Sequence, residues 1–117
     1  ETKDYLKLPK DTEHYWYNVL EKTLKREVKE EVGIEISNIE YLTSLATVHK
    51  DSNPSLVISC IADYVSGEIK LDPEETNDFA WVTRSEAQKY KLIDGIYDEL
   101  VMAEKKLDGK KTEWQRF

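Results

Sequence analysis

The segment Arg26–Ile34 constrains this chain more than any other stretch, because it combines a helical repeat with a stop signal. An apolar residue recurs at every fourth position before and within it, at Leu20, Leu24, Val28 and Val32. Residues four apart lie on one face of a helix, so the repeat predicts an amphipathic helix over about 20–32. Gly33 follows directly, and glycine ends a helix at little cost because it readily adopts the left-handed conformation.

Three carboxylates, Glu27, Glu30 and Glu31, fall within an arc about 100° wide on this helix. The arc borders the apolar stripe, whereas a face that is only solvated normally lies opposite the core. Such carboxylates repel one another unless a cation lies among them, and hard oxygen ligands suit Mg²⁺ or Mn²⁺. Arg26 can pair with one carboxylate and hold its orientation. The alternative is an ordinary charged surface, because Arg26 and Glu30 also form an i,i+4 pair worth only about 0.2–0.5 kcal/mol.

Length and charge limit the classes of function. The chain has 117 residues, enough for one domain with a modest core. With 39% hydrophobic and 35% charged residues, its composition is that of a charge-rich globular protein. The net charge of −7 argues against non-specific binding to nucleic acid or to an anionic membrane, because no basic excess neutralises phosphates. An acidic protein still binds phosphate compounds where a divalent cation neutralises the local charge.

Cys60 is the only cysteine, so no intramolecular disulfide is expected, and a reducing cytoplasm is the expected compartment. It lies in the apolar run 56–62, where a buried small side chain is the main interpretation and a catalytic thiol the alternative. His14 and His49 are isolated and match no Cys/His metal spacing. No apolar run approaches the roughly 20 residues that span a bilayer, and no signal peptide is expected.

The remaining segments predict further strands and a second helix. Strands are expected in the β-prone segments Tyr5–Leu8, His14–Val19, Ile34–Ile36, Ile39–Val48, Leu56–Val65, Glu68–Leu71 and Phe79–Val82. Of these, Leu56–Val65 is the most hydrophobic and the expected central strand. Turns are expected at Ser37-Asn38 and at 50–54, and Ser85 is the expected N-cap of a helical turn. An apolar repeat before Gly109 predicts a helix over about 94–107. Central strands flanked by helices predict an α+β domain in α/β/α layers.

The order of residues in Arg26–Ile34 is more specific than its composition. The pattern Arg-Glu-apolar-x-Glu-Glu-x-Gly-apolar resembles the second half of the Nudix box, found in hydrolases that cleave nucleoside diphosphates linked to another group. Asp78–Val82 followed by Ser85–Ala87 resembles the late Trp-Val strand and helical turn of the same family. The resemblance implies a single domain over 1–117, an α/β/α sandwich around a mixed β-sheet in which helix 20–32 is catalytic and helix 94–107 is C-terminal.

The resemblance also implies roles for individual residues. Glu27, Glu30 and Glu31 would hold Mg²⁺, with Mn²⁺ as a substitute, and Arg26 would orient them. The reaction would be the attack of water on a phosphorus atom of a diphosphate or longer phosphate chain. Glu75, six residues before Trp81 in an acidic loop, would add a further catalytic carboxylate. A solvated acidic loop is the alternative for Glu75.

The glycine-rich first half of the box is absent. It should place a Gly-Gly pair before the helix, but the four glycines of the chain are Gly33, Gly67, Gly95 and Gly109. Residues 15–19 resemble the strand that enters the glycine-rich loop, and residues 20–24 resemble the segment that leaves it. We therefore expect that a loop of roughly ten residues near 19–20, and part of the N-terminal strands, are missing. If the chain is naturally continuous there, it is a degenerate homologue, and the alternative of a catalytically decayed nucleotide-binding or regulatory domain gains support.

Aromatic side chains supply the candidate substrate contacts, with Tyr15, Trp16 and Tyr17 as the first choice and Trp81 as a further one. Stacking on a nucleobase is worth about 1–3 kcal/mol, while packing within the fold is the alternative role. We expect a small nucleotide-like substrate. These residues do not distinguish nucleotide sugars, ADP-ribose, damaged nucleoside triphosphates, dinucleotide polyphosphates or capped RNA. The aromatic residues at 114 and 117 pack back onto the chain or contact a second subunit, so a homodimer is compatible with the sequence.

Overall fold

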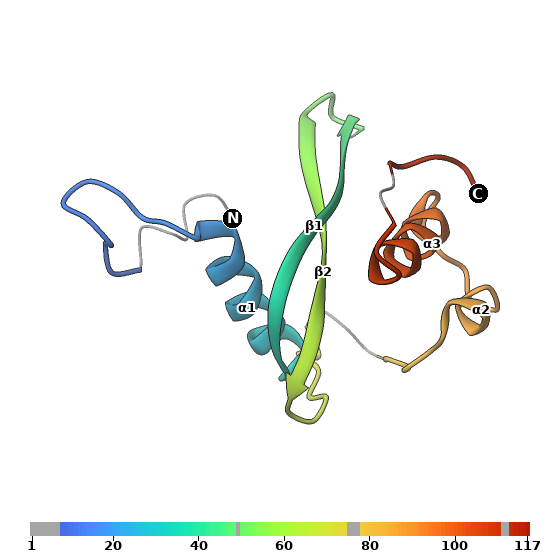
Figure 1. Cartoon of the computed structure of the whole chain (residues 1–117), viewed down its shortest axis with the longest axis horizontal. Coiled ribbons are helices and arrows are strands. Elements are labelled where there is room, and N and C mark those ends of the chain that lie inside the picture. Colours follow the sequence, from blue (N-terminus) through green and yellow to red (C-terminus); the bar gives the residue numbers. More distant parts are fainter. Residues whose placement is uncertain (1–7, 49, 75–77, 111–112) are drawn as a thin grey trace. The chain divides into compact units, whose positions relative to one another are not determined.

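The structure is a computed structural model that describes residues 8–48, 50–74, 78–110 and 113–117 (Figure 1). Its elements in chain order are α1 (Val19–Val32), β1 (Glu35–Val48), β2 (Pro54–Ser66), α2 (Arg84–Ala87) and α3 (Ile96–Leu107). Helices together with a sheet confirm the predicted α+β class. None of the helices in the described ranges is long and apolar enough to cross a membrane.

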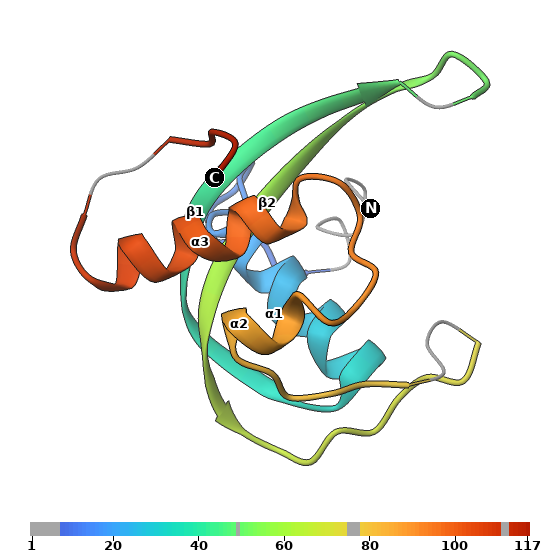
Figure 2. The same cartoon turned by 90° about the vertical axis from the view of Figure 1, so that its right-hand side faces the viewer.

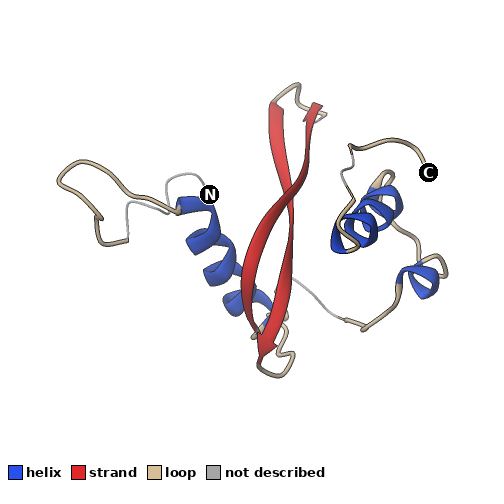
Figure 3. Ribbon diagram, in the orientation of Figure 1, coloured by secondary structure: helices blue, strands red, loops and turns tan. Residues whose placement is uncertain are grey.

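Strands β1 and β2 pair with each other in a two-stranded antiparallel sheet (Figure 3). The predicted turn between them is confirmed, with the Asp51 carboxylate accepting a hydrogen bond from the Asn53 backbone N–H at 3.0 Å. The turn predicted at Ser37-Asn38 is wrong, because β1 runs through it. Asn38 does adopt a positive φ of 51°, which asparagine tolerates. Its side-chain amide donates to Asp63 on β2 at 2.8 Å, so the strand continues across this residue.

Several predicted strands do not form. His14–Val19, Glu68–Leu71 and Phe79–Val82 contain no strand, Ile34–Ile36 is absorbed into β1, and Tyr5–Leu8 lies outside the described residues except for Leu8. β-propensity describes how a side chain fits a paired, half-buried surface, so a segment without a pairing partner does not become a strand. β2 is likewise no buried central strand: Leu56 is 72% exposed, and Cys60 is half-buried where burial was predicted.

The chain divides into two compact units. The α1 unit comprises Glu1–Ile39 and Ala62–Phe79, and the α3 unit comprises Glu40–Ile61 and Ala80–Phe117. Among the described residues of the α1 unit, the buried hydrophobic side chain is that of Ile34. The α3 unit buries Leu42, Ala87 and Met102, and Met102 has no exposed surface. Figure 2 shows α2 and α3 of this unit, which pack against each other.

The helix ends agree with the sequence at some positions and differ at others. Gly33 ends α1 with φ 82°, and its N–H donates to the Lys29 carbonyl at 3.0 Å, as predicted. At the other end, Asn18 precedes α1 with a left-handed φ of 53° and makes no side-chain capping bond. The C-terminal helix begins at Ile96, after the N-cap Gly95, and ends at Leu107 as predicted.

The N-cap predicted for α2 is wrong. Thr83, not Ser85, caps the helix: its hydroxyl accepts from the Glu86 N–H at 3.2 Å, and the Glu86 carboxylate accepts from the Thr83 N–H at 3.1 Å. This reciprocal pair is a capping box, and its Thr-x-x-Glu spacing is visible in the sequence. The bonds from the Thr83 backbone and side chain lower the pKa of Glu86, because they favour its charged form.

Candidate functional site

The predicted carboxylates lie in the second half of α1. Glu27 is half-buried, and Glu30 and Glu31 are exposed. Arg26 is also half-buried, and neither it nor Glu27 is free of interactions within the chain. The helix therefore carries the charged residues of the motif on a surface that a ligand can reach.

The C-terminal end of α1 is tied to the segment that follows β2. The Lys70 N–H donates to the Val32 carbonyl at 2.8 Å, and the Asp72 N–H donates to the Glu31 carbonyl at 3.1 Å. The last carbonyls of a helix have no partner within it, so these bonds satisfy groups that would otherwise need water. The start of the acidic loop is thereby fixed beside Glu31. Glu75 itself lies outside the described residues.

Two glycines let the backbones approach each other at this corner. A Cβ on Gly33 would lie 3.1 Å from the Glu68 carbonyl oxygen and 3.2 Å from Lys70. A Cβ on Gly67 would lie only 2.8 Å from the Gly33 carbonyl oxygen. Both glycines have positive φ, 82° and 104°. Neither position accommodates a side chain without a shift of the backbone, so the corner holds the end of α1 sterically as well as by hydrogen bonds.

The donor chemistry of Glu27, Glu30 and Glu31 fits a hard divalent cation, but their side chains are not gathered around one point. Within the described ranges, no three His, Cys, Asp or Glu side chains are arranged to hold a metal ion. The backbone of α1 brings the three carboxylates to one helix, and rotation about their flexible side-chain bonds would be needed to converge them. Their role as metal ligands stays a prediction.

The aromatic residues predicted to bind substrate lie in an irregular segment before α1. The Trp16 Nε1–H donates to the Leu8 carbonyl at 2.8 Å, and its ring lies 5.4 Å from the Lys10 ammonium. Tyr15 and Tyr17 have 63% and 59% of their surface exposed. They are therefore available to a ligand, and their role in stacking on a base stays a prediction.

Asp11 anchors this aromatic segment to α1. Its carboxylate accepts from the Tyr17 N–H at 2.8 Å and pairs with the Lys22 ammonium on α1 at 3.3 Å. The hydrogen bond from Tyr17, followed by the pairing with Lys22, lowers the pKa of Asp11. The anchor is in the first half of α1, whereas the carboxylates are in the second half. No described contact joins the two predicted groups of site residues to each other.

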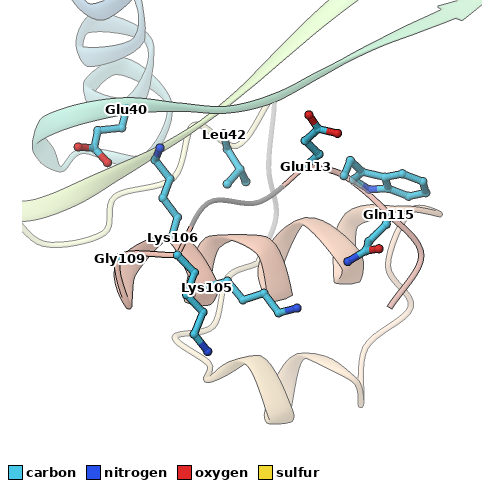
Figure 4. Close-up of a pocket in the computed structure, with 9 residues that line it drawn as sticks. Glu40, Leu42, Lys105, Lys106, Gly109, Glu113 and Gln115 are labelled. Carbon is cyan, nitrogen blue, oxygen red and sulfur yellow. The ribbon is translucent and has the colours of Figure 1, made fainter.

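The α3 unit contains a cavity of about 1010 Å³ that the sequence did not predict (Figure 4). Three lysines line it, Lys105, Lys106 and Lys110, together with Trp114 and residues of β1. None of the residues predicted to act in catalysis or binding lines it. The lysine-rich end of α3 in an otherwise acidic chain was the signal available in the sequence. Trp81, the further stacking candidate, is 66% exposed outside any helix or strand.

Comparison with known proteins identifies the family. The sequence model of the NUDIX domain matches residues 14–102, which include α1, β1, β2 and α2. The chain therefore belongs to the Nudix family.

Its curated relatives include proteins named NAD-capped RNA hydrolase NudC. The chain is 42% identical over 64 residues to the protein of Vibrio vulnificus, covering 55% of this chain and 23% of that protein. It is 41% identical over 61 residues to the protein of Actinobacillus succinogenes, covering 52% and 22%. Against the protein of Photobacterium profundum it is 39% identical over 67 residues, covering 57% and 24%. The chain thus spans less than a quarter of the length of these relatives.

Proposed function

We propose that this chain is the hydrolase domain of a Nudix enzyme that cleaves a diphosphate bond in a nucleoside diphosphate linked to another group. The observation that carries the proposal is the corner at Gly33. There the helix bearing the motif ends, and Asp72, at the start of the acidic loop, is hydrogen-bonded to Glu31. Membership of the family and the hydrolase names of the relatives support the same reaction class.

In this proposal, Glu27, Glu30 and Glu31 bind Mg²⁺, for which Mn²⁺ substitutes, and Arg26 orients one of them. When bound, such a cation neutralises the phosphate oxygens and makes water a better nucleophile. Glu75 supplies a further carboxylate from the acidic loop. Tyr15, Trp16 and Tyr17 bind the base of the substrate by stacking.

The relatives are named for NAD-capped RNA, so their names direct the choice of substrate to compounds that contain an NAD group. We propose an NAD-like dinucleotide, in which water adds to one phosphorus atom and the bridging P–O bond breaks to give two nucleoside monophosphates. The net charge of −7 favours a small dinucleotide over a long nucleic acid, which the chain would repel.

The experiment that tests the proposal is a screen of dinucleotides and nucleotide sugars with Mg²⁺, Mn²⁺ or a chelator. Product is detected as phosphate released by added phosphatase. We expect turnover with Mg²⁺, loss of turnover with the chelator, and a fall of about 100-fold or more for Glu30→Gln and for Glu31→Gln.

Glu35→Gln is the matched control, because Glu35 follows the motif and pairs with Lys29 at 3.1 Å. It should retain the activity of the wild type. If Glu30→Gln and Glu31→Gln are both as active as the wild type, the assignment of the carboxylates is wrong.

A second candidate is a Nudix-fold nucleotide-binding or regulatory domain whose catalytic box has decayed. Two observations favour it: no glycine precedes α1 in the chain, and the described carboxylates are not gathered into a metal site. This candidate predicts that NAD binds in a calorimetric titration while no product forms at any concentration of Mg²⁺ or Mn²⁺. The same screen therefore distinguishes the two functions.

A further inference from the structure

The lysine-lined cavity of the α3 unit has a volume of about 1010 Å³ and three walls. Glu40 and Leu42 line it from β1, the lysines from the end of α3 and the residue that follows it, and residues 113–115 from the C-terminal segment (Figure 4). Apart from the two residues of β1, the lining comes from beyond residue 102, where the match to the family ends. Membership of the family therefore does not account for this cavity.

The three lysines of the cavity form no ion pair with a carboxylate in the part of the chain that the structure describes. They are Lys105 and Lys106, which are half-buried, and Lys110, which is exposed. Both arginines of the same unit, in contrast, form ion pairs, Arg84 with Glu104 and Arg116 with Asp94 and Asp98. In a chain with 24 acidic and 17 basic residues, three lysines without an ionic partner around one cavity leave a local positive charge.

Helix capping does not explain the lysines. Lysine is common at helix C-termini, where its ammonium group donates to the last carbonyls and offsets the helix dipole. In α3, backbone N–H groups already donate to three of these carbonyls at 3.0–3.1 Å, in the pairs Asp108 to Glu104, Gly109 to Lys106 and Lys110 to Lys105. The ammonium groups are therefore not needed as donors to these carbonyls and are available to a ligand.

The C-terminal wall of the cavity is tied to α3 by described contacts. The Phe117 N–H and the Arg116 guanidinium both donate to Asp98 at 2.8 Å. The Phe117 ring lies 4.3 Å from the Lys105 ammonium, a cation–π contact that leaves the charge of the lysine in place. The wall that carries Trp114 is thus held beside the lysines, so the cavity is enclosed by elements that contact one another.

The lining favours an anion with more than one phosphate group. Lysine binds phosphate as a point charge, and two linked phosphates can contact two ammonium groups at once. The lining also includes two carboxylates, Glu40 and Glu113, and Glu113 already interacts within the chain. The volume is at the upper end of the range of about 300–1,000 Å³ that is usual for small-molecule sites.

We propose that this cavity binds a small anion that carries a diphosphate group, with the ammonium groups of Lys106 and Lys110 as its main contacts. None of the carboxylates proposed to bind a metal ion lines the cavity. The site therefore needs no metal ion and does not depend on the proposed hydrolase activity.

The test is a titration of the intact chain with inorganic pyrophosphate in metal-free buffer at neutral pH, followed by NMR of the indole N–H signals. Trp114 lines the cavity, so its signal should shift and saturate. Trp16 and Trp81 do not line the cavity and serve as internal references. We expect a dissociation constant of about 1 mM, typical of so small a ligand. Methyl phosphate, which has one phosphate group, should bind more weakly.

The double variant Lys106→Gln/Lys110→Gln should weaken pyrophosphate binding about tenfold or more, because it removes both main contacts. The matched control is Lys89→Gln/Lys91→Gln, which changes the net charge equally in the same unit at exposed lysines that do not line the cavity. It should bind pyrophosphate like the wild type. No saturation up to about tenfold above the expected constant, or the same affinity in both double variants, would overturn the proposal.

Glu40→Gln gives a prediction of opposite sign that does not require the loss of a lysine. It removes a negative charge from the lining, so it should strengthen pyrophosphate binding about twofold or more. Weaker binding by this variant would contradict the proposed charge preference.

A titration with ADP separates two sources of the diphosphate group. Tighter binding than that of pyrophosphate, reported by Trp114, indicates a nucleotide, and weaker binding indicates free pyrophosphate. A shift of Trp16 by ADP reports on the proposed substrate site before α1 and has no bearing on this cavity.

Discussion

Helices α1 and α3 have the same kind of apolar repeat in the sequence and are held in different ways in the structure. None of the 14 residues of α1 is buried. Among the 12 residues of α3, Asp98, Glu99 and Met102 are buried. An apolar stripe therefore predicts which face of a helix is hydrophobic, but not whether that face is covered. In the described ranges, α1 is positioned by backbone hydrogen bonds at its C-terminal corner, whereas α3 is positioned by side-chain burial.

The difference matters for function, because α1 carries the Nudix motif. A helix held at its end can present charged side chains to a ligand along its length. A helix held by its core-facing side chains has less surface available for that purpose. We expect that substitutions in the α1 stripe are tolerated better than substitutions in the buried face of α3, and that the corner residues are the sensitive positions of the α1 unit.

The largest expected loss of stability comes from substituting Met102. Met102→Ala should lower the free energy of unfolding by about 2–5 kcal/mol, because it leaves a cavity in a fully buried site. Leu24→Ala, at a half-buried position of the α1 stripe, should lower it by only about 1 kcal/mol. Urea unfolding followed by circular dichroism measures both. Equal losses of unfolding free energy in the two variants would show that α1 is as well covered in solution as α3. The proposed difference between the two helices would then be wrong.

A smaller effect is expected at the corner that ends α1. Gly67→Ala places a Cβ 2.8 Å from the Gly33 carbonyl oxygen at a φ of 104°, so it should cost about 1–3 kcal/mol. Gly109→Ala, at a φ of 78° with no atom within 4 Å of the new Cβ, should cost about 1 kcal/mol for the left-handed backbone alone. The difference between the two unfolding free energies isolates the steric contact. Identical values would mean that the corner relaxes freely and does not hold α1.

The smallest expected effect is a pH dependence at two exposed carboxylates with lowered pKa values, Asp94 in the α3 unit and Asp11 in the α1 unit. Hydrogen bonds from Arg116 hold the pKa of Asp94 below its ordinary value, so the charged form is favoured in the folded chain. The stability that the charged Asp94 carboxylate contributes is present above the ordinary carboxyl pKa of about 3.9. It is lost as the pH falls through the lower pKa of the folded state. The NMR signal of the Trp114 indole N–H should therefore change below about pH 4 in the wild type.

The control for this titration is Asp94→Asn, which should abolish the change at Trp114. Asp11 has a lowered pKa for the corresponding reason in the α1 unit, chiefly the hydrogen bond from the Tyr17 N–H. Asp11→Asn should therefore abolish an acid-dependent change at Trp16 while leaving that at Trp114 intact. If either variant altered the signals of both Trp114 and Trp16, the contacts of Asp94 and Asp11 would not be independent of each other.

The features that sequence reasoning predicted are those that local order determines. The repeat ending at Gly33 predicts α1, and the order of Arg26–Ile34 indicates the family, because each depends on neighbours a few residues apart. Phe79–Val82 was predicted as a strand and is not one, since pairing depends on a partner that local order does not specify. The hydrogen bond of Asp72 to Glu31, and that of Arg116 to Asp98, join residues far apart in the chain. No periodic signal marks such pairs, so the fixed corner of α1 and the contact of Arg116 with Asp98 emerged only from the structure.

The left-handed, uncapped Asn18 has a consequence for how this sequence can change length over generations. A loop lengthened at this point adds only about 0.6 kcal/mol of closure entropy for each doubling. Insertions here also leave the segment from Leu20 to Gly33 unchanged, because that segment lies after the junction. The junction before α1 can therefore gain residues at little cost in closure entropy while the segment Arg26–Ile34 stays unchanged.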